Sequence, residues 1–157
     1  MLQLLLLIII ANSSPVVARN MLGERWQTPI DFGIELRDGR PLLGRSKTWR
    51  GLIAACAACT LAAPLLGVHY LDGLAVALLA MAGDILASFL KRRLGYAPSS
   101  QSLLLDSLPE ALLPALFLRK TFLLTWLEAA ALVVLFAAIV RLTSPLLYRL
   151  GIRKRPW

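Results

Sequence analysis

Long apolar blocks alternate along this chain with short polar connections rich in Arg and Lys. Each block holds roughly 17–21 residues, close to the ~20 that an α-helix needs to cross ~30 Å of hydrocarbon. The five blocks are residues 2–18, 48–68, 71–90, 102–118 and 122–142. The pattern predicts an all-α integral membrane protein, a single domain over residues 1–157 with five transmembrane helices.

Two polar features modify this picture. The first block contains Asn12-Ser13-Ser14-Pro15, and Pro15 removes a backbone donor, so we expect the helix to be interrupted there by a kink or a break. The connection 19–47 contains an Asp38-Gly39 pair flanked by short mixed segments, which favours a short β-hairpin in this loop.

Composition supports the membrane assignment. The chain is 58% hydrophobic and its mean hydropathy is +0.70, well above a soluble average. The net charge of +8 would suggest a nucleic-acid partner in a soluble protein. Here the bases adjoin apolar blocks, as they do beside anionic headgroups, and no nucleic-acid motif occurs, so the expected partner is the lipid bilayer. Cys56 and Cys59 lie inside an apolar block, where they are expected to be small packing residues.

The distribution of bases predicts the orientation. With five spans, every Lys and Arg except Arg119 and Lys120 falls on one side of the membrane. Basic connections stay in the cytoplasm. We therefore expect a multi-pass protein of the cytoplasmic membrane, with its N-terminus outside and its C-terminus and the loop 19–47 inside.

Acidic residues inside the spans are the candidates for chemistry, because ionisable groups there are costly. Asp84, Asp106 and Glu110 are expected at similar depth near the cytoplasmic ends of their spans, whereas Glu128 lies nearer the outside. Asp106 and Glu110 share a helix face at i and i+4, where like charges repel.

A divalent cation would relieve that repulsion. Oxygen ligands at a water-accessible membrane edge suit Mg²⁺, which takes one or two carboxylates plus substrate phosphates. The alternative is that these acids form structural ion pairs with Lys91, Arg92 or Arg93.

A basic cluster precedes the second span. Lys47 and Arg50 are three residues apart at the start of a helix, with Thr48 between them. Free N–H groups and the helix dipole favour an anion at such a place. The cluster is a candidate phosphate clamp, and the alternative is ordinary anchoring of the helix at the cytoplasmic interface.

These residues resemble the CDP-archaeol synthase family, membrane cytidylyltransferases related to the CDP-diacylglycerol synthases. The resemblance spans nearly the whole chain. The segments that carry it are Asn12-Ser13-Ser14-Pro15, Pro29-Ile30-Asp31-Phe32-Gly33, Asp38-Gly39-Arg40-x-x-Leu43-Gly44-x-x-Lys47-Thr48-Trp49-Arg50-Gly51, Gly83-Asp84-x-x-x-Ser88-Phe89-x-Lys91-Arg92-Arg93-Leu94-Gly95, Asp106, and Leu150-Gly151 with Pro156-Trp157.

The resemblance implies a five-helix membrane fold and a Mg²⁺-dependent reaction in which CTP and a phosphatidate-like lipid give a CDP-lipid and pyrophosphate. It implies four catalytic residues, with metal binding by Asp84 and Asp106 and triphosphate binding by Lys47 and Arg50. The further contacts that it implies are Thr48, Ser88, Lys91 and Arg92 for nucleotide or lipid phosphate, and Asn12, Pro15 and Asp31 for the lining of the lipid pocket.

The chain departs from the family pattern at Pro109, where the family has a second Asp three residues after Asp106, and at Ser144, where it has Asn. Two interpretations are open: Glu110, beside Pro109, replaces the missing Asp as a metal ligand, or the metal site has fewer protein ligands.

Two other classes of function compete. Acids inside a membrane also mark ion-coupled transporters, which favour acids spread through the membrane and internal repeats. A non-catalytic scaffold that keeps the family fold is the second alternative, and Pro109 is the residue that favours it.

Overall fold

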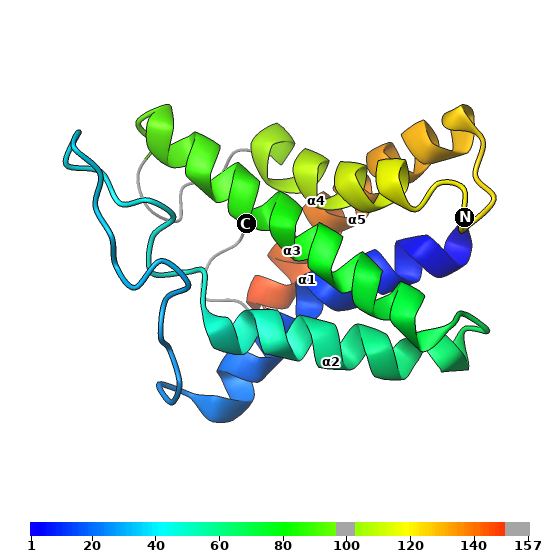
Figure 1. The fold of residues 1–157 in the computed structure, drawn as a ribbon, viewed down its shortest axis with the longest axis horizontal. Coiled ribbons are helices and arrows are strands. Elements are labelled where there is room, and N and C mark those ends of the chain that lie inside the picture. The colour runs from blue at the N-terminus through cyan, green and yellow to red at the C-terminus, as the bar shows by residue number, and fades with distance from the viewer. Residues whose placement is uncertain (97–102, 150–157) are drawn as a thin grey trace.

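The structure is a computed structural model that describes residues 1–96 and 103–149. This part of the chain contains five helices (Figure 1): α1 (Leu2–Leu22), α2 (Trp49–Leu65), α3 (Tyr70–Arg93), α4 (Leu103–Phe117) and α5 (Trp126–Arg149). Each predicted apolar block corresponds to one helix, which confirms the all-α class. In the described residues, α1, α3 and the stretch Trp126–Pro145 of α5 are long and apolar enough to cross a membrane, and α2 and α4 are shorter apolar helices.

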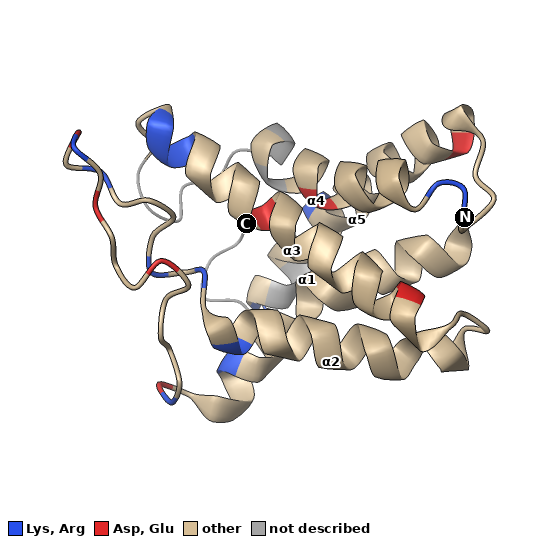
Figure 2. Ribbon diagram, in the orientation of Figure 1, with Lys and Arg blue, Asp and Glu red and all other residues tan. Residues whose placement is uncertain are grey.

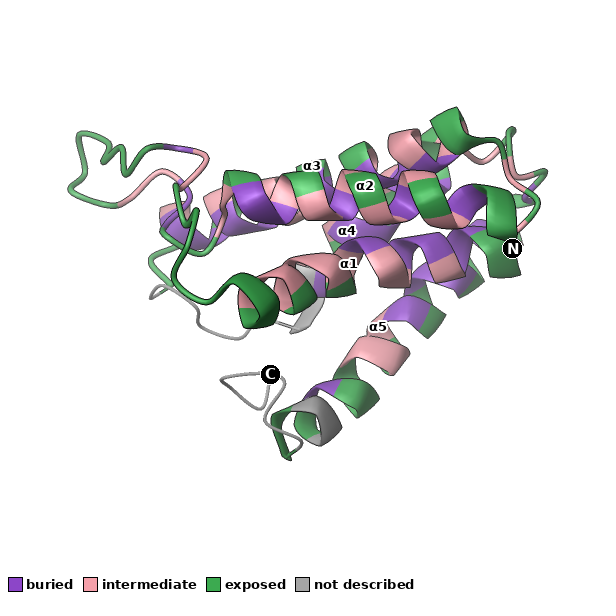
Figure 3. Ribbon diagram, turned by 90° about the horizontal axis from the view of Figure 1, so that it is seen from below, coloured by how far each residue is buried: buried purple, intermediate pink, exposed green. Residues whose placement is uncertain are grey.

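The helices form a bundle in which α3 packs against both α2 and α4, and α1 packs against α2 and α3. α5 packs on α4, and its second half leans away from the other helices (Figure 3). A buried apolar cluster joins the helices, with Leu4, Leu7 and Ile8 of α1 and Phe136 of α5 fully enclosed. The outer faces of the helices are exposed and apolar, as expected for surfaces that meet lipid.

Glycines let α3 approach its neighbours closely. A Cβ atom added to Gly83 would lie 2.2 Å from the carbonyl oxygen of Pro109 on α4. A Cβ added to Gly73 would lie 2.6 Å from the carbonyl oxygen of Cys59 on α2. Small residues of this kind allow membrane helices to pack backbone to backbone. The contact at Gly83 brings the next residue, Asp84, toward α4.

The predicted break of the first span at Pro15 was wrong. α1 continues through Pro15 to Leu22. The hydroxyl of Ser14 donates to the carbonyl of Ile10 (2.6 Å), and Pro15 packs closely on Gly51 of α2. Packing against a neighbouring helix makes a proline tolerable inside a membrane helix.

The start of α5 explains an acid that the sequence set apart. Glu128 donates its N–H to the Thr125 hydroxyl (3.2 Å), and its carboxylate accepts from the Thr125 N–H (2.8 Å). This reciprocal pair is a capping box, Thr-x-x-Glu, which begins the helix at Trp126 instead of residue 122.

The predicted β-hairpin was also wrong. The described residues of the loop contain isolated bridges, Pro29 with Thr48 and Glu35 with Pro41, and no strand. The chain does reverse at Asp38-Gly39, where the Leu36 N–H donates to the Arg40 carbonyl (2.9 Å). Pro41 has no N–H with which to extend a ladder.

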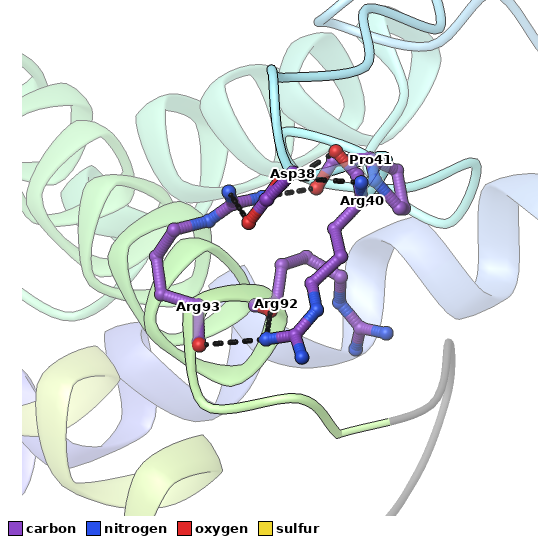
Figure 4. Close-up of polar contacts among 5 residues, drawn as sticks. All are labelled: Asp38, Arg40, Pro41, Arg92 and Arg93. Carbon is purple, nitrogen blue, oxygen red and sulfur yellow. Dashed lines mark hydrogen bonds and ion pairs between the residues drawn. The ribbon is translucent and has the colours of Figure 1, made fainter.

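The tip of this loop is tied to the end of α3 instead (Figure 4). Arg40 donates to the Arg93 carbonyl (2.9 Å) and so caps the last turn of α3. In return Arg93 donates to the Asp38 carboxylate (2.6 Å) and to the Pro41 carbonyl (2.8 Å). We call these contacts of Asp38, Arg40 and Pro41 with Arg93 the α3 latch.

Asp31 holds the base of the same loop. Its side chain is buried, and its carboxylate accepts N–H bonds from Gly33 (3.1 Å), Leu43 (2.9 Å) and Gly44 (3.1 Å). Burial alone would raise the pKa of Asp31, but these three backbone bonds outweigh it and lower that pKa. The bonds fix the backbone that leads into Lys47.

We predict that Gly83→Ala destabilises the protein. In an open helix this change would stabilise by about 0.5–1 kcal/mol. Here the methyl would meet the Pro109 carbonyl, so α3 and α4 must separate, at a cost of about 1–3 kcal/mol. Thermal unfolding in detergent measures the sign, with Ala82→Ser on the exposed face of α3 as the control. An unfolding midpoint higher than that of the wild type would contradict the tight contact.

We predict that Asp31→Asn lowers the unfolding midpoint at neutral pH, by the equivalent of about 1–3 kcal/mol, because an amide cannot accept on both sides. The native pKa of Asp31 lies below the ordinary value of 3.8. The contribution of its carboxylate to the stability of the fold is therefore fully present above pH 3.8 and is lost as the pH falls below that value, through the native pKa. The variant and the wild type should therefore converge in acid. Glu35→Gln, an exposed change in the same loop, is the control, and a constant difference at all pH values would refute this account.

Candidate active site

A cavity of about 200 Å³ lies where α1, α2 and α3 meet the loop. Many of the Lys and Arg residues lie at this end of the bundle (Figure 2). The polar part of its lining consists of Arg19, Gln27, Arg45, Ser46, Lys47, Thr48, Arg50 and Asp84. A space of this size has room for about seven waters at the density of the liquid, so it can take a chain of phosphate groups.

Lys47 and Asp84 form an ion pair inside the cavity. The Lys47 Nζ lies 2.6 Å from one carboxylate oxygen of Asp84 and 2.5 Å from the other. Their side chains are 19% and 23% exposed, so both can be reached from the cavity. The hydrogen-bonded partner of Asp84 in the described residues is therefore a residue of the loop, and Lys91, one of the structural partners that the sequence left open, also lies near enough to Asp84 to interact with its charge.

Behind this pair lies a second carboxyl group. Glu110 of α4 is buried, its carboxyl group is hydrogen-bonded to that of Asp84, and Asn12 of α1 donates to its other side. Two carboxyl groups in contact repel unless a proton or a cation lies between them. The sequence separates these residues widely, and the contact between Gly83 and Pro109 brings them together.

The carboxyl pair suits a divalent cation, because Mg²⁺ takes one or two carboxylates and completes its shell with phosphates and water. Within the described residues, no group of three or more His, Cys, Asp or Glu side chains gathers around one point. Asp106 lies in α4 one turn before Glu110, and its side chain is outside the described part of the structure. The donor set of Asp84 and Glu110 therefore fits Mg²⁺ as a partial shell.

The two residues at the start of α2 have structural contacts within the cavity wall. Thr48 caps the helix, its hydroxyl accepting from the Gly51 N–H (3.2 Å). Arg50 is buried, and its Nη1 donates to the carbonyls of Gly23 (2.9 Å) and Arg25 (2.5 Å). Arg50 therefore holds the end of α1 at the cavity.

Most of the other predicted site residues lie outside the lining of the cavity. Pro15 lines the cavity, but the lining does not include the side chains of Asn12 and Asp31, which are engaged with Glu110 and with the loop backbone. The buried side chains of Ser88, Lys91 and Arg92 lie further toward the end of α3, outside the cavity lining.

Sequence reasoning missed two bases that line the cavity, Arg19 and Arg45. Arg19 had been counted only as part of a basic connection. Its spacing of four residues from Pro15 was the available signal, since residues at i and i+4 share a helix face.

Comparisons with known proteins place the chain in a family. The family model described as CarS-like CDP-archaeol synthase matches residues 1–157. A CDP-archaeol synthase of Aeropyrum pernix is 41% identical over 98% of this chain and 89% of its own length. One of Pyrobaculum calidifontis is 38% identical, over 99% and 97%. A solved structure, described as "Structural insight into an intramembrane enzyme for archaeal membrane lipids biosynthesis", is 38% identical and superposes with a TM-score of 0.68 over 90% of this chain and 92% of that one.

Since the family model covers the full chain and a solved structure of 38% identity shares the fold, the protein belongs to the CDP-archaeol synthase family and is a multi-pass membrane enzyme, a CTP-dependent nucleotidyltransferase of lipid biosynthesis.

Proposed function

We propose that this enzyme transfers the cytidylyl group of CTP to the phosphate of a phosphatidate-like membrane lipid, and that the reaction depends on Mg²⁺. The observation that carries the proposal is the cavity lined by four basic side chains, Arg19, Arg45, Lys47 and Arg50, beside the paired carboxyl groups of Asp84 and Glu110. The bases match a triphosphate, and the carboxyl pair matches the cation that accompanies it. The names of the relatives make an ether-linked isoprenoid phosphatidate the first lipid to test.

The reaction needs no general base on the protein. A phosphomonoester has a second pKa near 6, so at neutral pH the lipid phosphate is largely a dianion. One of its oxygens attacks the α-phosphorus of CTP and forms a new P–O bond. The bond from the α-phosphorus to the bridging oxygen breaks, and pyrophosphate leaves with the electron pair. The obstacle is repulsion between two anions, so catalysis consists of positioning and charge neutralisation.

The residues of the cavity divide this work. Lys47 is close enough to Asp84 to neutralise it when no substrate is bound. A phosphate that enters the cavity competes for the same ammonium group, so Lys47 is expected to pass from Asp84 to a phosphate oxygen. This exchange frees Asp84 for the metal while the total charge of the site stays balanced.

Asp84 and Glu110 would hold the Mg²⁺, and Asp106 lies on the same face of α4 as Glu110, four residues earlier. The metal would supply neutralisation of phosphate charge. Asn12 donates to Glu110 and keeps its carboxyl group turned toward Asp84. Asn12 therefore supports the site from α1.

We also propose that all five helices cross the membrane, with the N-terminus outside and the cavity facing the cytoplasm, where CTP is available. The clustering of Lys and Arg at the end of the bundle that carries the loop supports this orientation (Figure 2). The lipid would reach the cavity from the bilayer, since apolar side chains such as Val16, Leu52 and Ile85 complete its lining.

The direct experiment incubates the purified protein with labelled CTP, Mg²⁺ and a panel of phosphatidic acids, including ether-linked isoprenoid ones. We expect a CDP-lipid and one equivalent of pyrophosphate. The product yields will show which lipid is preferred. No product should form when EDTA removes the Mg²⁺. Absence of CDP-lipid with every lipid, from protein that is folded and inserted, would refute the proposal and favour a transporter or a scaffold.

For the carboxyl pair, we predict that Asp84→Asn lowers kcat/KM by at least about 100-fold, because the neutral amide cannot hold the cation. Glu110→Gln, which keeps the size of the side chain, should lower the affinity for Mg²⁺ and be partly rescued by higher Mg²⁺ concentrations. Mg²⁺ titrations of the activity measure both. Glu128→Gln, a change of the same type in the helix cap, is the control, and near-wild-type turnover of Asp84→Asn would remove the metal assignment.

A further inference from the structure

Arg19 lies in the last turn of α1 and lines the cavity. Its Nε atom is buried and has no hydrogen-bond partner among the described residues. Buried polar groups are nearly always bonded, so a guanidinium N–H at a cavity wall that no described residue bonds is available to a ligand in the cavity, which the buried Nε atoms of Arg92 and Arg93, outside the lining, are not.

Two other bases of the cavity, Lys47 and Arg50, are already engaged by groups of the protein. Lys47 is paired with Asp84, and the Nη1 of Arg50 is bonded to the carbonyls of Gly23 and Arg25. Asp84 is the acid among the described residues that line the cavity, and Lys47 already neutralises it. The α1 wall of the cavity therefore carries positive charge that no described carboxylate balances, and an anion is the ligand that fits it.

The end of α1 is also held in place. Arg50 bonds the backbone just after α1, at Gly23 and Arg25, and a Cβ added to Gly51 would lie 3.1 Å from Pro15, one turn before Arg19. Contacts on both sides of Arg19 fix its backbone before any ligand arrives. A cation fixed in advance loses little freedom on binding.

We propose that Arg19 binds the pyrophosphate portion of CTP and stabilises it as the leaving group. This inference rests on the proposed function and extends it to a residue that neither the motifs nor the carboxyl pair include. When the bond between the α-phosphorus and the bridging oxygen breaks, its electron pair stays on the departing β-phosphate. A planar guanidinium donates two parallel bonds to such a group, which suits Arg better than Lys.

A lipid headgroup phosphate could occupy the same guanidinium, because a basic residue at a helix end often anchors the helix at the interface. The two sources of phosphate differ in one measurable way. A pyrophosphate site is sensitive to soluble pyrophosphate in saturating lipid, whereas an interfacial anchor is not.

The test measures kcat, the KM for CTP and the inhibition constant of inorganic pyrophosphate for the full-length wild type and for Arg19→Gln, Arg19→Lys and Arg25→Gln. Arg25 is exposed and outside the cavity lining, so Arg25→Gln removes the same charge from the same segment. We expect Arg19→Gln to raise the inhibition constant of pyrophosphate by at least about tenfold, equal to about 1.4 kcal/mol. Arg19→Lys should fall between the wild type and Arg19→Gln.

Inhibition by CMP, which lacks the β- and γ-phosphates, should change less than about twofold in Arg19→Gln, well below that factor of ten. Equal shifts for CMP and pyrophosphate, or the same shift in Arg25→Gln, would overturn the assignment to the leaving group. An unchanged inhibition constant in Arg19→Gln would make Arg19 an interfacial anchor.

A measurement on the wild type covers the case in which Arg19→Gln does not fold. Phenylglyoxal modifies accessible arginines, and mass spectrometry locates the modified residues. Pyrophosphate should protect Arg19 and leave Arg25 reactive, and equal modification of Arg19 with and without pyrophosphate would refute the proposal. Because protection needs no turnover, it tests Arg19 even if CDP-lipid synthesis fails, so the two proposals can fail separately.

Discussion

The contact between α3 and α4 at Gly83 and Pro109 is the constraint on which the site depends. The two backbones are so close that any side chain at position 83 would meet the Pro109 carbonyl. Asp84 and Glu110 are the next residues along their helices, so the same contact sets their carboxyl groups side by side. In a membrane interior, where polar groups need partners from the protein, close packing is also what keeps such a pair away from lipid.

The other groups that bond this pair come from other elements. Asn12 comes from α1, and Lys47 comes from the loop. The loop has no strand ladder among its described residues, so its shape depends on side chains that bond backbone: Asp31 at its base, and the α3 latch at its tip. These bonds make the position of Lys47 a property of the fold, although Lys47 lies outside any helix.

Much of this arrangement could be predicted from the sequence. The apolar blocks located all five helices, because hydrophobicity over ~20 residues is a strong signal. Motif resemblance identified Lys47 and Asp84, but it could not show that they form an ion pair, since that depends on how the loop folds back on α3. The hairpin and the break at Pro15 were wrong because both rested on local propensity, which tertiary contacts at Arg93 and Gly51 override. Arg19 was missed because a base at a helix end usually serves only as an anchor.

The replacement of the expected Asp by Pro109 illustrates how geometry resolves what spacing leaves open. By spacing alone, the loss of a carboxylate at position 109 removes a metal ligand. In the structure, position 109 contributes its backbone to the helix contact, and the carboxyl group that meets Asp84 belongs to the following residue, Glu110. The chain therefore keeps two carboxyl groups in contact between α3 and α4, and the scaffold alternative that Pro109 favoured loses its main support.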